Sequence, residues 1–370
     1  MIMSKAQAAI RQIGWPRLII GLFFLLLVAV SPMMGLKLDD VVSDVLRRWS
    51  MFGVLILAMV PGVQSGIGLN FGVSLGIVAG LIGGTTAIEL SFRAGMARPW
   101  VDLGMALAVA IPIATLLGYV YGLLLNRVKG SEMTVSTYVG FSAIAFSNII
   151  WLLLPYRSGT LIWPIGGEGM RNTISLEESF GGLMSNPEIA ARQPGFLRFL
   201  AFEVGGITVP LGVMLFFLFM CLMMWFFLRS KTGIAMSAAG ENELFTRSNA
   251  INVDHMRILG TVLSTVLGAV GIVMYASVFG FLQLYNAPLM MGFQCVAAIL
   301  IGGATTRRAS ITNVIVGALL FQGILTTSLP VIKRLMPSGS TLSEVLRIII
   351  SNGIILYALS KTKGGNQVEK

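Results

Sequence analysis

Residues 205–228 read GGITVPLGVMLFFLFMCLMMWFFL, a run of 24 residues without a charged side chain. An apolar helix of about 20 residues is long enough to cross the hydrocarbon core of a bilayer, which is about 30 Å thick. The strands of a membrane barrel would instead alternate in polarity over about 10 residues. This stretch therefore predicts a membrane-spanning α-helix.

The composition extends that prediction to the whole chain of 370 residues. Hydrophobic residues make up 55% and charged residues only 11%, and the mean hydropathy is +0.84. A soluble domain carries about 25% charged residues to cover its surface. The sequence thus predicts an all-α integral membrane protein in which residues 1–370 form a single transmembrane domain.

Ten apolar blocks are long enough to be transmembrane helices. They cover residues 18–35, 50–66, 69–90, 101–125, 133–154, 205–228, 258–281, 288–306, 311–329 and 342–360. The first block is longer than the apolar core of a usual signal peptide, and Ala29-Val30-Ser31-Pro32 is a poor cleavage site. We therefore expect this block to remain as a span.

Basic residues orient these spans, because Lys and Arg are enriched in cytoplasmic loops. Ten spans place both termini on one side of the membrane. With the termini inside, 14 Lys and Arg are cytoplasmic and 7 are outside, once the long loop 155–203 is left out. Long loops carry little topological information. We therefore expect cytoplasmic termini.

Several functions lack the residues that they need. One His and two Cys, both inside apolar blocks, provide no ligand set for zinc or haem. The sequence has no GxxxxGK[ST] motif, so any ATP must be hydrolysed by another subunit. The net charge of +10 is typical of basic residues beside membrane spans. Without a basic block interleaved with aromatics, it does not indicate nucleic-acid binding.

A glycine-rich stretch, QSGIGLNFG at 64–72, separates the second and third spans. It is either a helix break at membrane depth, which protein or a water-filled cavity must cover, or a tight turn at the membrane surface. Glycine then recurs at every fourth position through Gly72, Gly76, Gly80 and Gly84. This stripe predicts that another helix packs closely against the third span.

A short motif occurs twice, as LIGGTT at 81–86 and as LIGGAT at 300–305. Each copy ends the third span of a five-span half. Because five is odd, equivalent spans of the two halves run in opposite directions. The motif is thus compatible with a possible inverted five-helix repeat.

Two segments between the spans are too polar to cross the membrane. Loop 155–203, expected on the extracytoplasmic side, contains four prolines and seven glycines. It is long enough either to fold into short helices and turns that dock a partner or to act as a flexible connector. The other segment, 229–257, is expected in the cytoplasm.

Several motifs resemble one family. They are Gly206-Ile207-Thr208-Val209-Pro210, Arg229-Ser230-Lys231-Thr232-Gly233, Gly240-Glu241-Asn242-Glu243, Arg247-Ser248-Asn249-Ala250-Ile251-Asn252-Val253, Ile301-Gly302-Gly303 and, more faintly, Gly66 to Gly72. The chain resembles the permease subunits of ribose-type ABC importers over about residues 50–360. These subunits take up simple sugars and related small polar solutes in the bacterial plasma (inner) membrane.

The resemblance implies that segment 229–257 contains the coupling helix that rests on an ABC ATPase subunit. The implied coupling residues are Gly240, Glu241, Asn242, Glu243, Phe245, Arg247, Ser248, Asn249, Ile251 and Asn252. Charged and amide groups alternate here with apolar ones, which suits a short amphipathic helix; a solvated loop is the other interpretation. The resemblance also implies a second permease chain, identical or homologous, and an extracytoplasmic solute-binding protein. No cofactor is expected in this chain, because the partner ATPase binds ATP.

Two departures from the family separate this chain from a ribose permease. Gly68 stands where the family commonly has Asp, and Arg307-Arg308 follow Gly302-Gly303 where the family has small residues. These differences point away from ribose itself. They also fit one half of a heteromeric pair.

Amide side chains in the spans are our candidates for the solute path. Amides carry both hydrogen-bond donors and acceptors, which suits a neutral sugar-like or nucleoside-like solute. The candidates are Gln64 and Asn70 with Phe71 alongside, followed by Asn148, Gln294 and Asn313. The alternative for each amide is a hydrogen bond that bridges two helices.

An ion- or proton-coupled secondary transporter is the main alternative function. A broken helix and an inverted repeat would suit it equally well. Such carriers bury ionisable groups within their spans. Spans two to nine contain almost none, and Glu89 and Asp102 lie at span ends. We therefore favour the ATP-driven permease, which is not itself an enzyme.

Overall fold

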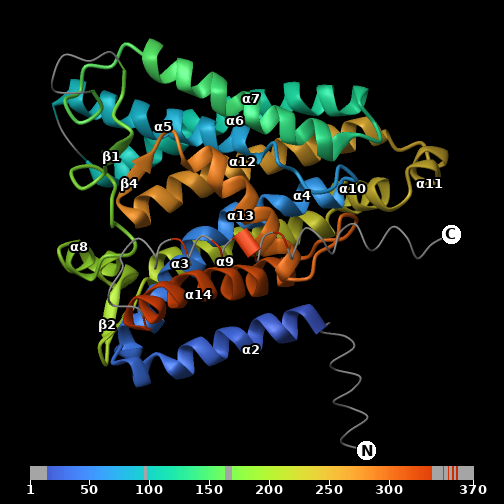
Figure 1. Ribbon diagram of the computed structural model, residues 1–370. Helices are drawn as coiled ribbons and strands as arrows, with labels where there is room; N and C mark the ends of the chain where they lie inside the picture. The colour runs from blue at the N-terminus through green and yellow to red at the C-terminus, as the bar shows by residue number, and fades with distance from the viewer. Residues whose placement is uncertain are drawn as a thin grey trace, which may run out of the picture.

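The computed structural model describes residues 15–95, 98–162 and 169–335, together with the single positions 345, 349, 352, 353 and 356. Its long helices lie side by side in one elongated bundle (Figure 1). The helices are α2 (Trp15–Val30), η1 (Pro32–Met34), α3 (Leu38–Leu57), α4 (Met59–Gln64), α5 (Val73–Ala94), α6 (Pro99–Arg127), α7 (Glu132–Leu153), α8 (Pro187–Ala191), η2 (Gly195–Leu200), α9 (Leu211–Arg229), α10 (Lys231–Glu241), α11 (Glu243–Ser248), α12 (Val253–Phe279), α13 (Ala287–Ile301) and α14 (Ile311–Leu335).

Four short strands lie at one end of the bundle, which we call the strand end (Figure 1). They form two antiparallel pairs: β1 (Thr173–Ser175) with β4 (Phe281–Gln283), and β2 (Phe202–Val204) with β3 (Ile207–Val209). Helix α11 lies at the opposite end, which we call the α11 end. The two polar segments noted in the sequence are therefore at opposite ends of the molecule.

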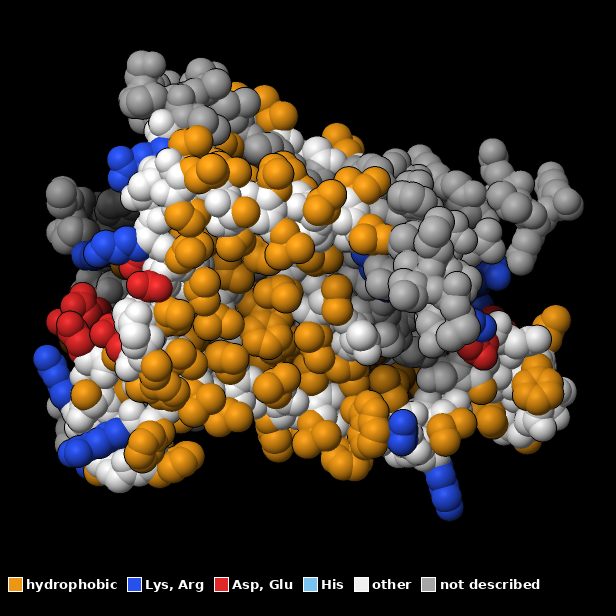
Figure 2. Space-filling model, turned by 90° about the horizontal axis from the view of Figure 1, so that it is seen from below, with side chains coloured by type: hydrophobic (Ala, Val, Ile, Leu, Met, Phe, Trp, Pro, Cys, Tyr) orange, Lys and Arg blue, Asp and Glu red, His pale blue; other side chains and the backbone are white. Residues whose placement is uncertain are grey.

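Seven described helices are long and apolar enough to cross a membrane. They are Arg17–Met34, Val73–Ala94, Pro99–Arg127, Glu132–Leu153, Leu211–Arg229, Val253–Phe279 and Ile311–Arg334. Helix α13 is apolar but shorter. Figure 2 shows hydrophobic side chains over the middle of one face and charged side chains gathered towards its two ends. The chain is an all-α, multi-pass membrane protein.

Nine of the ten predicted spans coincide with described helices, within differences at their ends. The tenth, 342–360, lies outside the described residues apart from single positions. The predicted start of span 205–228 is wrong, because residues 205–209 belong to the β2–β3 hairpin and α9 begins at Leu211. Gly205 and Gly206 have φ of 60° and 87° and form the two-residue turn of that hairpin.

Helix α3 begins at Leu38, well before the predicted span 50–66. Its first half carries charged residues and lies beside β3, where the Ser43 hydroxyl accepts a hydrogen bond from the Thr208 N–H at 2.9 Å. Its side chains are continuously buried from Ser50 onwards. The predicted boundary thus marks where burial begins rather than where the helix begins.

Helix α12 is the centre of the bundle and packs against α3, α5 and α6. The glycine stripe of α5 makes this packing close, as predicted. A methyl group added to Gly76 would overlap the Thr265 carbonyl oxygen, and one added to Gly80 would lie 2.6 Å from the Ala269 carbonyl oxygen. Only glycine lets the two backbones approach to this extent.

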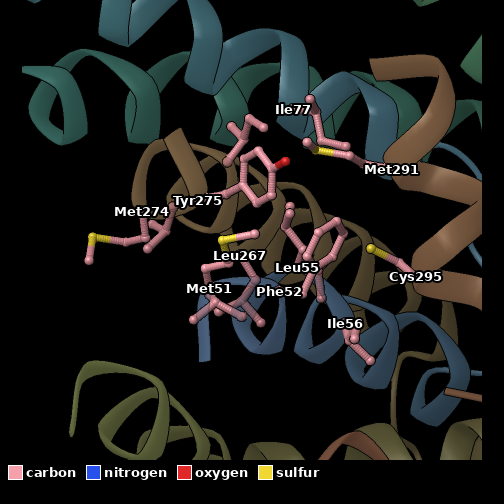
Figure 3. Close-up of a cluster of buried hydrophobic side chains, with 14 of the residues drawn as sticks. Met51, Phe52, Leu55, Ile56, Ile77, Leu267, Met274, Tyr275, Met291 and Cys295 are labelled. Carbon is pink, nitrogen blue, oxygen red and sulfur yellow. The ribbon is translucent and has the colours of Figure 1, made fainter. Parts of the chain in front are cut away.

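Large apolar side chains fill the space between these helices. Figure 3 shows Phe52 and Leu55 of α3 facing Tyr275 of α12, with Ile77 and Met291 nearby. The Phe52 and Tyr275 rings meet edge to face at 5.0 Å between centroids, a preferred arrangement for aromatic pairs. Close packing of this kind fixes the positions of the helices that carry the candidate site.

The long loop 155–203 is folded against the bundle over its described part. Strand β1 pairs with β4, and the Ser277 hydroxyl donates a hydrogen bond to the Phe180 carbonyl oxygen at 2.7 Å. The buried Glu89 carboxylate accepts hydrogen bonds from the N–H groups of Arg157 and Ser158 at 3.0 and 2.9 Å. The interpretation as a flexible connector is therefore wrong for this part of the loop.

The two copies of the LIGG motif have different conformations. Gly83 and Gly84 lie inside α5, where a methyl group on Gly83 would overlap the Ala106 carbonyl oxygen of α6. Gly302 and Gly303 instead follow the end of α13, and Gly303 has φ of 89°. The motif does not mark equivalent local structures, so it provides no support for a repeat.

Candidate coupling segment and solute path

The segment after α9 folds into two short helices, each begun by a polar side chain. The Ser230 hydroxyl accepts a hydrogen bond from the Gly233 N–H at the start of α10. Asn242 separates the helices and begins α11, because its side-chain oxygen accepts from the Phe245 N–H at 3.0 Å. Asn252 begins α12 in the same way through the His255 N–H. Ser and Asn satisfy the free N–H groups of a first helical turn, which explains why the helices start here.

Helix α11, which lies at the α11 end of the molecule (Figure 1), has two large apolar side chains that are exposed. Leu244 is 81% exposed and Phe245 is 62% exposed. Thr246, from the same turn, is buried and faces the bundle. The helix is thus amphipathic, with its apolar side facing outward. A surface helix that packs only onto its own protein would turn its apolar side inward.

Ion pairs hold α11 onto the bundle. The Glu243 carboxylate lies 2.7 Å from Arg247 in α11 and 3.1 Å from Lys129, which follows α6. Lys129 also pairs with Asp254 of α12 at 2.6 Å. Burial alone would raise the pKa of Glu243, but the hydrogen bonds and charges of Lys129 and Arg247 hold that pKa below its ordinary value of 4.5. The carboxylate therefore stays ionised at neutral pH.

A buried ion pair lies beneath this exposed network. The Arg257 guanidinium of α12 donates to the Glu132 carboxylate of α7 at 2.5 Å, and the two side chains are only 6% and 13% exposed. Arg257 also donates to the Asn126 side-chain oxygen at 3.0 Å. Helices α6, α7 and α12 are therefore joined where they reach the α11 end.

The glycine-rich stretch leaves the helical conformation over residues 65–72, which we call the break. It joins two antiparallel helices, because α3 and α5 both have their far ends at the strand end (Figure 1). Gly66 and Gly68 have φ of 80° and 86°, which favour glycine. The break is almost entirely buried. The chain thus reverses direction at a turn that the protein itself covers, and its depth in the membrane stays a prediction.

Asn70 is fully buried inside the break and makes three hydrogen bonds. Its amide nitrogen donates to the Ser264 hydroxyl of α12 at 2.9 Å. Its oxygen accepts from the Tyr121 hydroxyl of α6 at 2.8 Å and from the Gly72 N–H at 2.9 Å. This geometry matches the helix-bridging alternative, and the predicted role of Asn70 in the solute path stays a prediction.

Two other candidate amides also contact backbone. Gln64 donates to the Ala309 carbonyl oxygen at 2.5 Å. The Asn313 side-chain nitrogen donates to the Gly302 carbonyl oxygen at 2.7 Å. Its side-chain oxygen accepts from the N–H of Ser310, the residue before α14, at 2.8 Å. Both amides therefore attach the loop between α13 and α14 to the neighbouring structure.

The remaining candidates lie elsewhere in the bundle. Phe71 is half-buried and its ring lies 5.3 Å from that of Phe293 in α13, which in turn lies 6.1 Å from Phe141 in α7. Asn148 and Gln294 are both half-buried, and the Asn148 side-chain oxygen has no partner in the described structure. The structure thus groups Gln64, Phe71 and Asn313 near the break or its neighbouring loop, and it places Asn148 apart on α7.

Sequence reasoning missed three residues that complete these contacts. Tyr121 and Ser264 hold Asn70, and Gly260 lets α12 approach the break, since a methyl group on it would lie 2.9 Å from the Pro61 carbonyl oxygen. Gly260, Ser264 and Gly268 recur four residues apart in α12, a spacing that is typical of close helix packing. No group of His, Cys, Asp or Glu in the described residues could hold a metal ion.

The comparison with known families decides the class of protein. Residues 24–359 match the family described as "Branched-chain amino acid transport system / permease component". The chain belongs to this ABC permease family. The resemblance to ribose-type permeases is confirmed at this level, since the family includes both branched-chain amino acid and ribose-type permeases. No curated protein and no solved structure matches the permease.

Family membership assigns this permease to substrate uptake. Members are transport subunits rather than enzymes, and they work with an ATPase and other components of a transport complex. The predicted coupling residues lie at the α11 end. Their individual roles stay predictions.

Proposed function

We propose that this permease is the membrane subunit of an ATP-driven importer for a small, neutral, polar solute, and that α11 docks onto the ATPase. The exposed apolar pair Leu244 and Phe245 carries the proposal. An aromatic side chain buried at a docking site contributes about 2 kcal/mol or more to binding. The ion pairs of Glu243 keep the helix in place without covering its apolar side.

A second permease chain is supported by the outward side of α7. Thr134, Tyr138 and Ser142 are exposed on the first half of this membrane-length helix, whereas its second half exposes large apolar residues such as Phe146. The exposed side of α9 carries large apolar residues such as Leu215 and Phe219. Lipid cannot hydrogen-bond to polar groups, so we expect the first half of α7 to face a second permease and the solute path, and the second half of α7 and the exposed side of α9 to face lipid.

A partner at the opposite end is supported by a hollow of about 940 Å³ at the strand end. Residues from α3, the end of α12 and loop 155–203 line it, among them Asp40, Glu177 and Arg192. Its walls are fixed by the hydrogen bonds of loop 155–203. We propose that an extracytoplasmic solute-binding protein docks here, which places the strand end outside and the α11 end in the cytoplasm of a bacterium.

The buried carboxylates favour ATP over an ion gradient. Glu89 accepts hydrogen bonds from loop 155–203, Asp102 accepts from the Ser91 and Ser179 hydroxyls, and Glu132 pairs with Arg257. Each carboxylate therefore has a structural partner instead of facing an open path. Amides and hydroxyls in the bundle suit a sugar-like or nucleoside-like solute.

The test compares Phe245→Ala with Phe226→Ala. Phe226 is a matched control, because it is 60% exposed but lies on the apolar side of α9. Phe245→Ala should weaken ATPase binding about 30-fold, the equivalent of about 2 kcal/mol. Phe226→Ala should bind normally. ATPase affinity and ATP-dependent uptake into vesicles are measured for both, and normal binding and uptake by Phe245→Ala would contradict the docking site.

A further inference from the structure

The end of α10 touches the start of the break at backbone atoms of Gly240 and Gly66. A methyl group on Gly240 would overlap the Gln64 carbonyl oxygen and would lie 2.7 Å from the Gly66 nitrogen. In the other direction, a methyl group on Gly66 would lie 2.9 Å from the Gly240 Cα atom. No side chain separates the two segments, so neither can move towards the other without displacing its backbone.

Helix α12 holds the break from another direction. A methyl group on Gly260 would overlap the Ser65 hydroxyl oxygen and would lie 2.9 Å from the Pro61 carbonyl oxygen. Residues 61–66 therefore lie between α10 and α12 with backbone contact to both. Contacts between packed backbones transmit a displacement, because the interior is as dense as a molecular crystal.

The loop between α13 and α14 completes the contact. Gln64 donates to the Ala309 carbonyl oxygen at 2.5 Å, and Arg308 lies 3.4 Å from the Glu241 carboxylate, next to Gly240. A methyl group on Gly68 would lie 3.5 Å from the Thr306 carbonyl oxygen. The break, the end of α10 and this loop thus contact one another in a closed ring.

The break is the part of this ring that can change shape. It lacks regular helical hydrogen bonds, and Gly66 and Gly68 have positive φ that other residues rarely adopt. Hinges are usually a few residues at the ends of helices that absorb changes in φ and ψ. Phe71, at the far side of the break, contacts Phe293 of α13.

We infer that Gly240 and Gly66 form a backbone joint through which a movement of α10 and α11 reaches the break and the aromatic side chains beyond it. Gly240 is then a positioning residue for transport, which acts without contacting solute or ATP. The inference rests on the proposed function, and it adds the route by which the coupling segment acts.

The first test is Gly240→Ala, with Gly104→Ala as control. Gly104 lies in α6 with no atom within 4 Å of an added methyl group. In Gly240→Ala, ATP-dependent uptake per assembled transporter should fall about tenfold, a typical size for coupling between sites. ATP hydrolysis should continue. Unchanged uptake per assembled transporter would overturn the joint.

A reversible cross-link tests the joint without altering its glycines. Cysteines replace the exposed Glu241 and Arg308, and a bifunctional thiosulfonate reagent links them through disulfides. The native Cys221 and Cys295 are buried, so they should not compete. Uptake should stop in the linked protein and return after reduction to the level that the double-cysteine variant has before linking. Full uptake by the linked protein would overturn the inference even if Gly240→Ala does not fold.

The unchanged permease separates the two levels of the proposal. If it shows no ATP-dependent uptake with its ATPase, the proposed function and the joint both fail. If it shows uptake, and both Gly240→Ala and the linked protein retain it, only the joint fails.

Discussion

Replacing Asn70 by Leu distinguishes a helix-bridging amide from an amide of the solute path. The substitution removes the donor to Ser264 and the acceptor for Tyr121 and Gly72. A hydrogen bond between membrane helices contributes about 0.6 kcal/mol on average. The two bonds to α6 and α12 give about 1.2 kcal/mol, and the lost bond to the Gly72 N–H together with the groups left buried without partners brings the loss to about 2 kcal/mol.

A loss of about 2 kcal/mol lowers the ratio of folded to unfolded protein about 30-fold. We therefore expect Asn70→Leu to lower the midpoint of thermal unfolding in detergent and to lower expression. Uptake per folded molecule should stay close to that of the unchanged permease. The assay follows the monodisperse fraction against temperature, together with ATP-dependent uptake into vesicles normalised to folded protein.

Asn148→Leu is the matched control, because it makes the same change at a half-buried asparagine whose side-chain oxygen has no partner in the described structure. Its effect should stay within about 0.5 kcal/mol. Tyr121→Phe should cost about 1 kcal/mol alone and much less when Asn70 is already Leu, because both changes remove one shared hydrogen bond. An unchanged unfolding midpoint with lost uptake in Asn70→Leu would refute this reasoning and assign Asn70 to the path.

Three further predictions follow from contacts in the described residues. Arg257→Met should destabilise the protein by about 3 kcal/mol, because it leaves the Glu132 carboxylate buried without its cation. The double variant Arg257→Met/Glu132→Leu should recover most of the lost unfolding midpoint. Equal midpoints for the single and double variants would contradict this prediction. Glu89→Ala should raise the rate of amide hydrogen exchange at Arg157 and Ser158 about tenfold, because both N–H groups lose their acceptor. A tenfold change corresponds to a loss of about 1.4 kcal/mol from the two hydrogen bonds together. The control Glu188→Ala, in the same loop, should leave exchange at these two positions unchanged. A cysteine at the exposed position Gly159 should react with an impermeant reagent from outside, and one at the exposed position Thr232 should react only from the cytoplasmic side. Reaction of both cysteines from the same side would overturn the predicted topology. Ser158 is unsuitable for this test because it is buried.

The sequence by itself determined the membrane class, most of the helices and the position of the polar segment 229–257. Lipid offers no hydrogen bonds, so a long apolar segment must satisfy its own backbone, and a helix does so within the segment. The length of an apolar run therefore predicts a span without knowledge of its neighbours. The stripe from Gly72 to Gly84 likewise predicted close packing, because its spacing puts the glycines on one side of a helix.

Local sequence also misplaced some boundaries. Gly205 to Pro210 is apolar enough to extend a span, but positive φ at two glycines makes a hairpin there. The charged start of α3 hid a helix that continues outside the apolar block. In both cases hydropathy reported where the chain is apolar, whereas backbone geometry set where the helix begins.

Only the tertiary structure decided what the polar residues contact. Asn70 bonds to residues 51 and 194 positions away in the chain, so no local pattern could distinguish a bridge from a solute ligand. The approach of Gly240 to Gly66 likewise depends on how α10 folds back onto the bundle. A polar or small side chain takes its role from the groups that folding brings within contact distance, and those groups come from helices that are distant in sequence.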